Sequence, residues 1–213
     1  APKGRSVANV GTIVEANGVV YLGGDFTHVG QHVEGTVLVD LAASPLDFAL
    51  PVVNGTVNVI TSDGDGGFYL GGAFNAVGGI ARANLAHLRG DKTVDLDFGP
   101  TTDGAVRALA VSANAVFVAG NVAAVNSQPR AGLAAVNPTN GQLLDWNPAP
   151  DGGVLALAAG ANVVYAAGTF ATIGGQARQF IAALDAVSGK ATPWQSISDD
   201  VVSVLTLANG QLY

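Results

Sequence analysis

One segment near the N-terminus brings together side chains that could bind a metal ion. His28, His32 and Glu34 follow a His-x-x-x-His-x-Glu pattern, and imidazole nitrogens together with a carboxylate are common zinc ligands. Histidines four residues apart converge on one face of a helix, but this segment is typical of a loop. An exposed polar loop is therefore the favoured interpretation, and a metal site is the alternative.

A second candidate is an acidic segment in which Asp63 and Asp65 precede Gly66. It resembles part of the Asp-rich calcium loops found between propeller strands. The first ligand position holds Thr61, however, and no glutamate follows at a useful distance. The sequence favours a simple acidic hairpin turn, and calcium binding is the alternative.

Arginine recurs at a constant spacing, at Arg82, Arg130 and Arg178. If these side chains faced a common axis, they could form an anion-binding ring. A guanidinium group has five donors in a fixed geometry, which also suits it to capping main-chain carbonyls or pairing with an aspartate. We favour the second, structural interpretation.

Patterns that would indicate an enzyme are missing from the sequence. It has no Gly-x-Ser-x-Gly elbow, phosphate loop or dinucleotide fingerprint. Glycosidases need two or three converging carboxylates, whereas the aspartates here fall mainly in turns. Asp103, Asp151 and Asp199 are equally spaced, which indicates a structural role, and His87 is expected alone on a strand face. We therefore predict no catalytic, cofactor-binding or metal-binding residues and no cofactor.

Composition narrows the classes of partner. The 16 acidic and 9 basic residues give a net charge of -7, and an acidic chain without a basic stripe repels nucleic acid and anionic lipids. Cysteine is absent, which excludes disulfides and thiolate sites. Residues 108–129 and 152–177 are uncharged and long enough to span a bilayer. Their asparagines and glycines, and the turn at the equivalent place elsewhere in the chain, favour soluble strands over a membrane span.

The elements that carry these residues are set by an internal repeat of 48 residues. Aromatic residues recur at Tyr21, Tyr69, Phe117, Tyr165 and Tyr213. A second series is Leu50, Phe98, Trp146 and Trp194, and a third is Gly24, Gly72, Gly120 and Gly168. Residues that a repeat requires are typically used for packing between neighbouring units. The glycines indicate a place where another backbone approaches closely.

Each unit is predicted to contain four short strands separated by glycine- and asparagine-rich turns. Repeated four-stranded units of this length are typical of β-propeller blades, and a β-solenoid is the rival architecture. We predict an all-β propeller with blades at 9–56, 57–104, 105–152 and 153–200. Residues 201–213 would form a partial blade, and residues 1–8 the end of a preceding unit.

The repeat also resembles a known family. An aromatic-x-Gly-Gly-x-Phe string, then Val-Gly-Gly, Arg and Leu-Ala, ends in an aromatic-Asn-Pro such as 146–148. This pattern is similar to the delta-60-type propeller repeats of secreted bacterial proteins. The first unit departs from it, with Glu34 in place of arginine and Leu50-Pro51 in place of the aromatic-Asn-Pro. The resemblance implies an extracellular or cell-surface setting and no particular reaction.

These observations favour a non-catalytic structural or interaction scaffold. A glycan- or ligand-binding propeller is the alternative, with the loop of His28 and His32 as its best candidate site, and a polysaccharide hydrolase or lyase is less favoured. Residues 15–21 match residues 207–213, so the chain starts and stops at the same phase of the repeat. We expect an incomplete ring whose open blade edge can associate with another copy, and the protein or glycan partner is unknown.

Overall fold

The computed structural model describes residues 9–16, 19–25, 36–40, 50–196 and 198–213. Within these ranges the chain forms strands and turns without a helix, in agreement with the predicted all-β class. No helix long and apolar enough to cross a membrane occurs in these ranges. Residues 1–8 and the candidate metal loop at His28, His32 and Glu34 lie outside the described residues.

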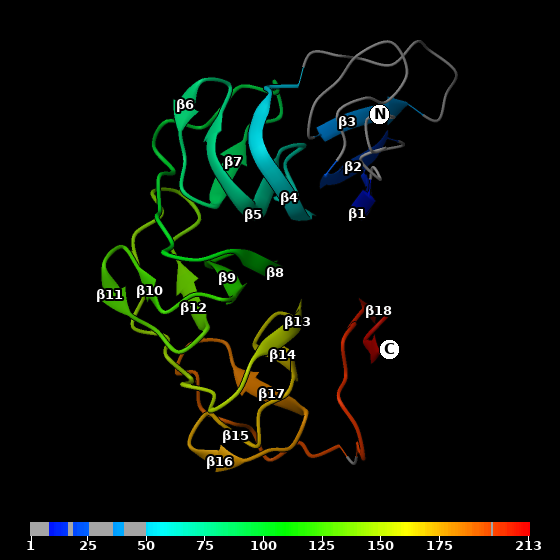
Figure 1. Ribbon diagram of the computed structural model, residues 1–213. Helices are drawn as coiled ribbons and strands as arrows, with labels where there is room; N and C mark the ends of the chain where they lie inside the picture. The colour runs from blue at the N-terminus through cyan, green and yellow to red at the C-terminus, as the bar shows by residue number, and fades with distance from the viewer. Residues whose placement is uncertain (1–8, 17–18, 26–35, 41–49, 197) are drawn as a thin grey trace, which may run out of the picture.

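The strands form successive antiparallel units along the chain (Figure 1). The first unit contains β1 (Asn9–Ala16), β2 (Val19–Asp25) and β3 (Thr36–Asp40). The second contains β4 (Val53–Ser62), β5 (Phe68–Val77), β6 (Ile80–Ala81) and β7 (Leu85–Leu88). The third contains β8 (Val106–Ser112), β9 (Ala115–Gly120), β10 (Ala124–Val125), β11 (Gln128–Pro129) and β12 (Leu133–Val136).

The fourth unit repeats the third, and a short hairpin begins the fifth. The fourth unit contains β13 (Val154–Ala159), β14 (Val163–Gly168), β15 (Thr172–Ile173), β16 (Gln176–Ala177) and β17 (Ile181–Asp185). The hairpin consists of β18 (Leu207–Ala208) and β19 (Gln211–Leu212). The units follow an arc, with β4, β8 and β13 on its inner side and the hairpins β10–β11 and β15–β16 on its outer side (Figure 1).

The hydrophobic core lies between consecutive sheets. Phe98 of the second unit packs with Val106 of the third in one buried cluster. Phe117 and Trp146 of the third unit pack with Leu184 of the fourth in another. Each unit thus buries one face against the next, as expected for a chain of repeats. The prediction that the in-register aromatics serve packing is confirmed for these residues.

The recurring glycines mark a close approach of two backbones, as predicted. A Cβ atom at Gly72, Gly120 or Gly168 would collide with a main-chain carbonyl oxygen of the preceding strand segment. The oxygens concerned belong to Thr56, Ala105 and Gly153, respectively. Glycine is therefore needed at this point of each of these three units.

Two details differ from the predicted blades. The fourth strand is reduced to one β-bridge per unit, Leu88 to Val94, Val136 to Leu143 and Leu184 to Ala191. After each bridge the chain leaves the sheet. In the third unit, for example, Pro148 follows soon after the bridge at Leu143. The predicted boundary at 56/57 falls inside β4, because residues from Val53 onward already pair with the end of β5.

The first strand of each of the four larger sheets carries a β-bulge. The pairing register shifts between Val10 and Thr12, Val57 and Val59, Val106 and Ala108, and Val154 and Ala156. The residues left inside these bulges are Gly11, Asn58, Arg107 and Leu155. A bulge re-aims the side chain that it carries, so these positions are set apart from the regular strand alternation.

Candidate functional site

The inner side of the arc borders a central cavity that is open to solvent. Residues of β1, β4, β8, β13 and the segment 203–207 line a space of about 700 Å³. A second space of about 430 Å³ shares Asn58, Arg107, Leu155 and Ser203 with it. No carboxylate is among the described residues that line either space. The converging acidic residues that a propeller glycosidase needs are therefore not among the described lining residues of these two spaces.

The repeated arginines do not form an anion-binding ring, and their predicted structural role is confirmed. In each case Nη1 donates to the carbonyl of the preceding residue, at 2.8–2.9 Å. Nη2 donates to a carbonyl of the segment that follows the third strand, from Arg82 to Asp95, from Arg130 to Leu144 and from Arg178 to Thr192. The guanidinium groups thus tie two loops of their own unit together.

Two of the equally spaced aspartates also hold loops, as predicted. Asp103 Oδ1 accepts hydrogen bonds from the amides of Ala123 and Ala124, each at 2.9 Å. Asp151 Oδ1 accepts the equivalent pair from Ala171 and Thr172, and these amides hold the pKa of Asp151 below its usual value. The third member of the series, Asp199, is exposed.

The second unit contains a polar cluster that the sequence did not predict. His87 is not isolated on its strand, because its ring lies between two carboxylates. Nε2 is 3.0 Å from Asp63 Oδ2, and Nδ1 is 2.9 Å from Asp95 Oδ2. Arg89 Nη2 extends the network by donating to Asp95 Oδ1 at 2.6 Å and to Asp97 Oδ2 at 3.1 Å.

The cluster is mostly buried, and each ring nitrogen of His87 lies within hydrogen-bond distance of a carboxylate oxygen of Asp63 or Asp95. The side chains of these three residues are only 9–12% exposed. Burial alone would raise the pKa of Asp95, but hydrogen bonds from His87, Arg89 and the amide of Asp97 outweigh it and lower that pKa.

The same cluster is specific to one unit of the repeat. Stepping by 48 residues from His87 leads to Ala135 and Ala183, and stepping from Asp63 leads to Val111 and Ala159. The positions equivalent to Asp95 in the third and fourth units hold Leu143 and Ala191. Three positions that hold small or apolar residues in the later units therefore hold a polar triad in the second unit. The sequence contained a signal for this cluster, because all three positions depart from the repeat in the same unit.

Asp63 also closes the hairpin between β4 and β5. Its Oδ1 accepts hydrogen bonds from the amides of Asp65 at 2.7 Å and Gly67 at 2.8 Å. The prediction of an acidic hairpin turn at Asp63 and Asp65 is confirmed by these bonds. In the part of the chain that the structure describes, no group of three or more metal-capable side chains is arranged to hold an ion.

Tyr69 covers one face of the His87 ring. The two rings stack with centroids 4.3 Å apart, and Tyr69 Oη donates to the carbonyl of Pro138 in the next unit at 3.1 Å. Burial, followed by the nearby charges of Asp63, Asp95 and Asp65, raises the pKa of Tyr69 to about 12. The phenol is therefore held in its neutral form next to the carboxylates.

A spectrophotometric titration is expected to detect this shift. One of the four tyrosines should ionise near pH 12 instead of 10, and Tyr69→Phe should remove that late step. Because the native state holds this proton more tightly than the unfolded chain, the associated stability is complete below pH 10 and is lost as the pH rises through 12. A pH-jump measurement of tyrosine absorbance, completed before the protein unfolds, tests the raised pKa of Tyr69. A late step that survives in Tyr69→Phe would contradict it.

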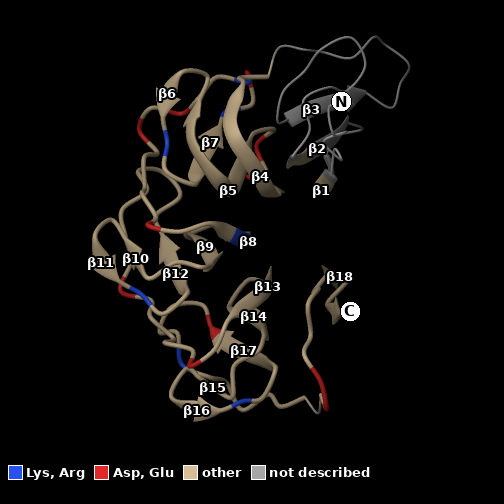
Figure 2. Ribbon diagram, viewed as in Figure 1, with Lys and Arg blue, Asp and Glu red and all other residues tan. Residues whose placement is uncertain are grey.

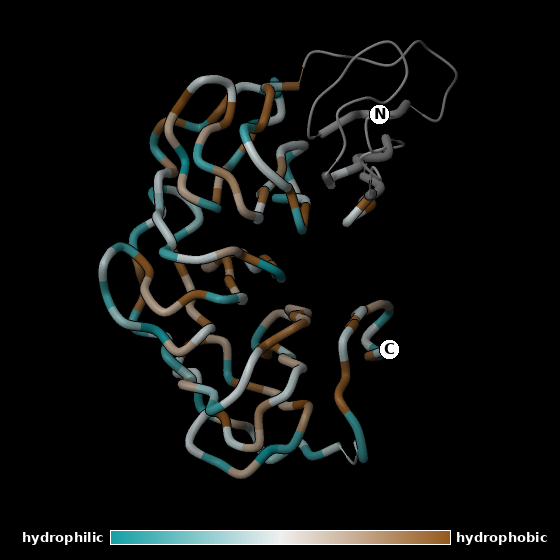
Figure 3. The backbone as a smooth tube through the Cα atoms, viewed as in Figure 1, coloured by the Kyte–Doolittle hydropathy of each residue, from teal (hydrophilic) through white to brown (hydrophobic). Residues whose placement is uncertain are grey.

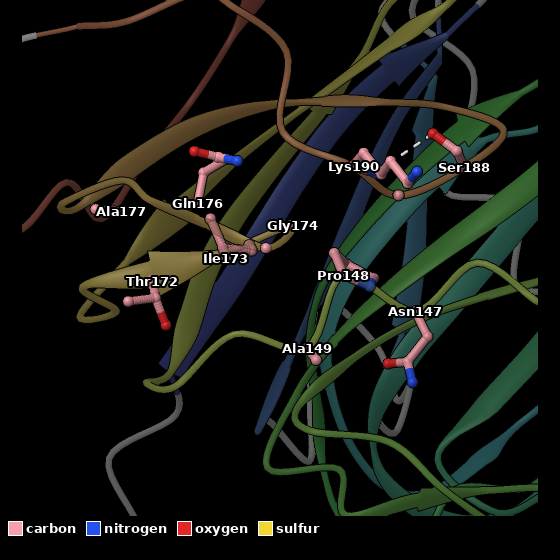
Figure 4. A pocket seen from close by; sticks show the side chains of 12 residues that line it. Asn147, Pro148, Ala149, Thr172, Ile173, Gly174, Gln176, Ala177, Ser188 and Lys190 are labelled. Atoms are coloured by element: carbon pink, nitrogen blue, oxygen red, sulfur yellow. Dashed lines mark hydrogen bonds between the residues drawn. The ribbon is translucent and has the colours of Figure 1, made fainter.

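A further hollow lies beside the β15–β16 hairpin of the fourth unit (Figure 4). It has a volume of about 760 Å³ and is lined by residues 147–149, 172–177 and 188–190. Lys190 is the one charged side chain that lines it in the described chain, and the amide of Lys190 is 3.4 Å from Ser188 Oγ. Main-chain groups and small residues form most of its wall, so it carries little chemistry.

Comparison with solved structures identifies the fold. The Pan2 WD40 domain of Neurospora crassa matches with a TM-score of 0.55 and 10% identity, over 93% of this chain and 55% of that chain. The computationally designed Ika8 protein matches with a TM-score of 0.54 and 15% identity, over 95% and 66%. The chain thus spans just over half of the first structure and less than two thirds of the second. WD40 repeats form propeller blades, so the predicted propeller-like fold is confirmed.

No protein-family model matches the sequence, and the search of curated proteins found no match.

Proposed function

We propose that this chain is a non-catalytic interaction module of the β-propeller type. The polar groups of the cluster around His87 are committed to each other and to the main chain. Both nitrogens of His87 face carboxylates, Arg89 pairs with Asp95 and Asp97, and Tyr69 donates to a carbonyl. An extracellular or cell-surface setting is part of the proposal and rests on the resemblance to delta-60-type repeats.

The observation that carries the proposal is an incompletely covered face on the fourth unit. Trp146 of the third unit is 2% exposed, contacts Phe117 edge-on and donates from Nε1 to the carbonyl of Asp185 at 3.0 Å. Trp194, one repeat later, makes the same edge-on contact with Tyr165 but is 36% exposed. Its indole nitrogen has no hydrogen-bond partner among the described residues.

The fifth unit covers part of this face. Val202, Leu205 and Leu212 pack on a cluster of just three buried residues, Ala156, Ala167 and Ile181. A hydrophobic stretch before β18 supplies part of this contact (Figure 3). Val204 and Tyr213 remain exposed, at 73% and 68%. In the described strands, β19 pairs with β18 alone.

The partner that fits this face is another sheet of the same repeat. The equivalent face of the third unit is covered by the fourth unit, whose carbonyl at residue 185 receives the Trp146 N–H. A second copy of this chain offers such a sheet together with strand edges that can pair. Self-association through the Trp194 face and the β19 edge is therefore the interaction that we propose.

Sedimentation equilibrium of the purified chain tests the proposal. We expect a concentration-dependent dimer whose affinity falls about 30-fold in Trp194→Gln, because a central tryptophan is a typical interface hot spot. Leu96→Gln is the matched control, since Leu96 is 67% exposed on the second unit. A monomer at all concentrations, or equal effects of both variants, would contradict self-association. Turnover of a polysaccharide that disappears with a single Asp→Asn replacement would contradict the non-catalytic role.

A further inference from the structure

The central cavity contains a single charged side chain among its described lining residues, Arg107. This arginine lies in the β-bulge of β8, between Val106 and Ala108, where the pairing with β9 is interrupted. The basic segment of β8 faces the middle of the arc in Figure 2. The bulge therefore directs a cation into a space that is otherwise neutral.

The side chain of Arg107 is not used by the fold. It is exposed, and no hydrogen bond or ion pair connects it to another residue in the described part of the chain. This distinguishes it from the repeated arginines, whose Nη atoms are bonded to carbonyls. It also departs from the repeat, because the positions 48 residues before and after it are Val59 and Leu155.

Neighbouring strands fix the main chain that carries this arginine. Asn58, the bulge residue of β4, donates from Nδ2 to the carbonyl of Val106 at 2.8 Å. Val106 is fully buried in the cluster between the second and third units. The bonded bulge therefore fixes where the Arg107 side chain starts, while the flexible side chain itself has to become ordered when a ligand binds.

The rest of the lining suits a hydroxylated ligand. Polar side chains from different units border the space, namely Thr12, Asn58, Thr61, Ser62, Ser203 and Thr206. Hydroxyl and amide groups both donate and accept hydrogen bonds. The volume of about 700 Å³ is within the range of small-molecule sites, about 300–1,000 Å³.

From this arrangement we propose that the central cavity binds a small sugar acid through Arg107. The planar guanidinium fork matches a carboxylate bidentately. One cation in a chain of net charge -7 balances one negative charge, which favours a monocarboxylate over phosphate dianions. The hydroxyl groups of the ligand would be received by the threonine, serine and asparagine side chains. The cavity shares segment 203–207 with the surface proposed for self-association. Arg107 and Trp194 lie on different units, however, so glucuronate binding and dimer formation are tested with different variants and either proposal can fail without the other.

Titration with D-glucuronate, followed by NMR or calorimetry, tests the site. We expect saturable binding, with D-glucose binding at least about tenfold more weakly because it lacks the carboxylate. Arg107→Leu should weaken glucuronate binding about 10–100-fold, as expected for loss of a charge-assisted hydrogen-bonded pair. Arg107→Lys should retain part of the affinity.

The controls separate this site from general charge effects. Arg107→Leu copies the residue that the fourth unit has at the same position, Leu155, so the variant is expected to fold, as circular dichroism would verify. Lys190→Gln removes one positive charge outside the cavity and should leave the affinity unchanged. Absence of glucuronate binding, equal binding of glucose, or equal affinity of Arg107→Leu and the parent protein would each overturn the proposal.

Discussion

Trp146→Ala is expected to destabilise the protein by about 3–5 kcal/mol, as is typical of a large aromatic residue removed from a core. The indole is 2% exposed and contacts the ring of Phe117, with centroids 4.9 Å apart. Its removal would leave a cavity in the cluster that joins the third and fourth units. It would also leave the carbonyl of Asp185 without the N–H that it now accepts. Denaturant unfolding measures the loss.

Two further variants divide this effect into its parts. Trp146→Phe keeps an aromatic ring but removes the hydrogen bond to Asp185, and should cost about 1–2 kcal/mol. Trp194→Ala, at the same position of the next unit, should cost less than half of the Trp146 value in the monomer, because Trp194 is 36% exposed. Equal losses at 146 and 194 would contradict the unequal burial of the two faces.

The features that repeat could be predicted from the sequence. The glycines of the second strands recur because they meet a carbonyl of the first strand, as Gly72 meets Thr56. The arginines recur because each one caps loops in its own unit, as Arg82 does at Asp95. A residue type that every unit needs for its fold recurs at a fixed spacing. Such a spacing is visible in the sequence alone.

The candidate sites could not be predicted in the same way, because they are departures from the period. His87 meets Asp63 across 24 residues and Asp95 across 8, and these pairings depend on strand register. The register of β4 against β5 is shifted by one residue relative to the third and fourth units, so the bulge falls at Asn58 instead of 59. Hydrophobic patterns do not indicate a bulge, and so the inward direction of Arg107 could not be inferred.

His87→Ala is the second substitution with a large expected effect, about 2–3 kcal/mol of lost stability. The alanine itself is acceptable at this position, since Ala135 and Ala183 are buried at the equivalent places. The loss comes from Asp63 and Asp95, each of which would lose the hydrogen-bond partner of one oxygen in a mostly buried environment. The variant therefore measures the cost of leaving one oxygen of each carboxylate, Asp63 Oδ2 and Asp95 Oδ2, without its partner.

A triple variant tests this explanation against a simple loss of packing. Asp63→Asn, His87→Ala and Asp95→Leu together remove the ionisable groups of the triad, and the alanine and leucine are residues that later units have at the equivalent positions. The asparagine introduced at position 63 keeps a side-chain oxygen for the amides of residues 65 and 67. Replacing a buried charged network by apolar groups is often neutral in stability. We therefore expect the triple variant to be more stable than His87→Ala alone, although it carries two more changes. If its unfolding free energy is lower than that of His87→Ala, the charges of the triad stabilise the fold in a way that an apolar interior cannot replace.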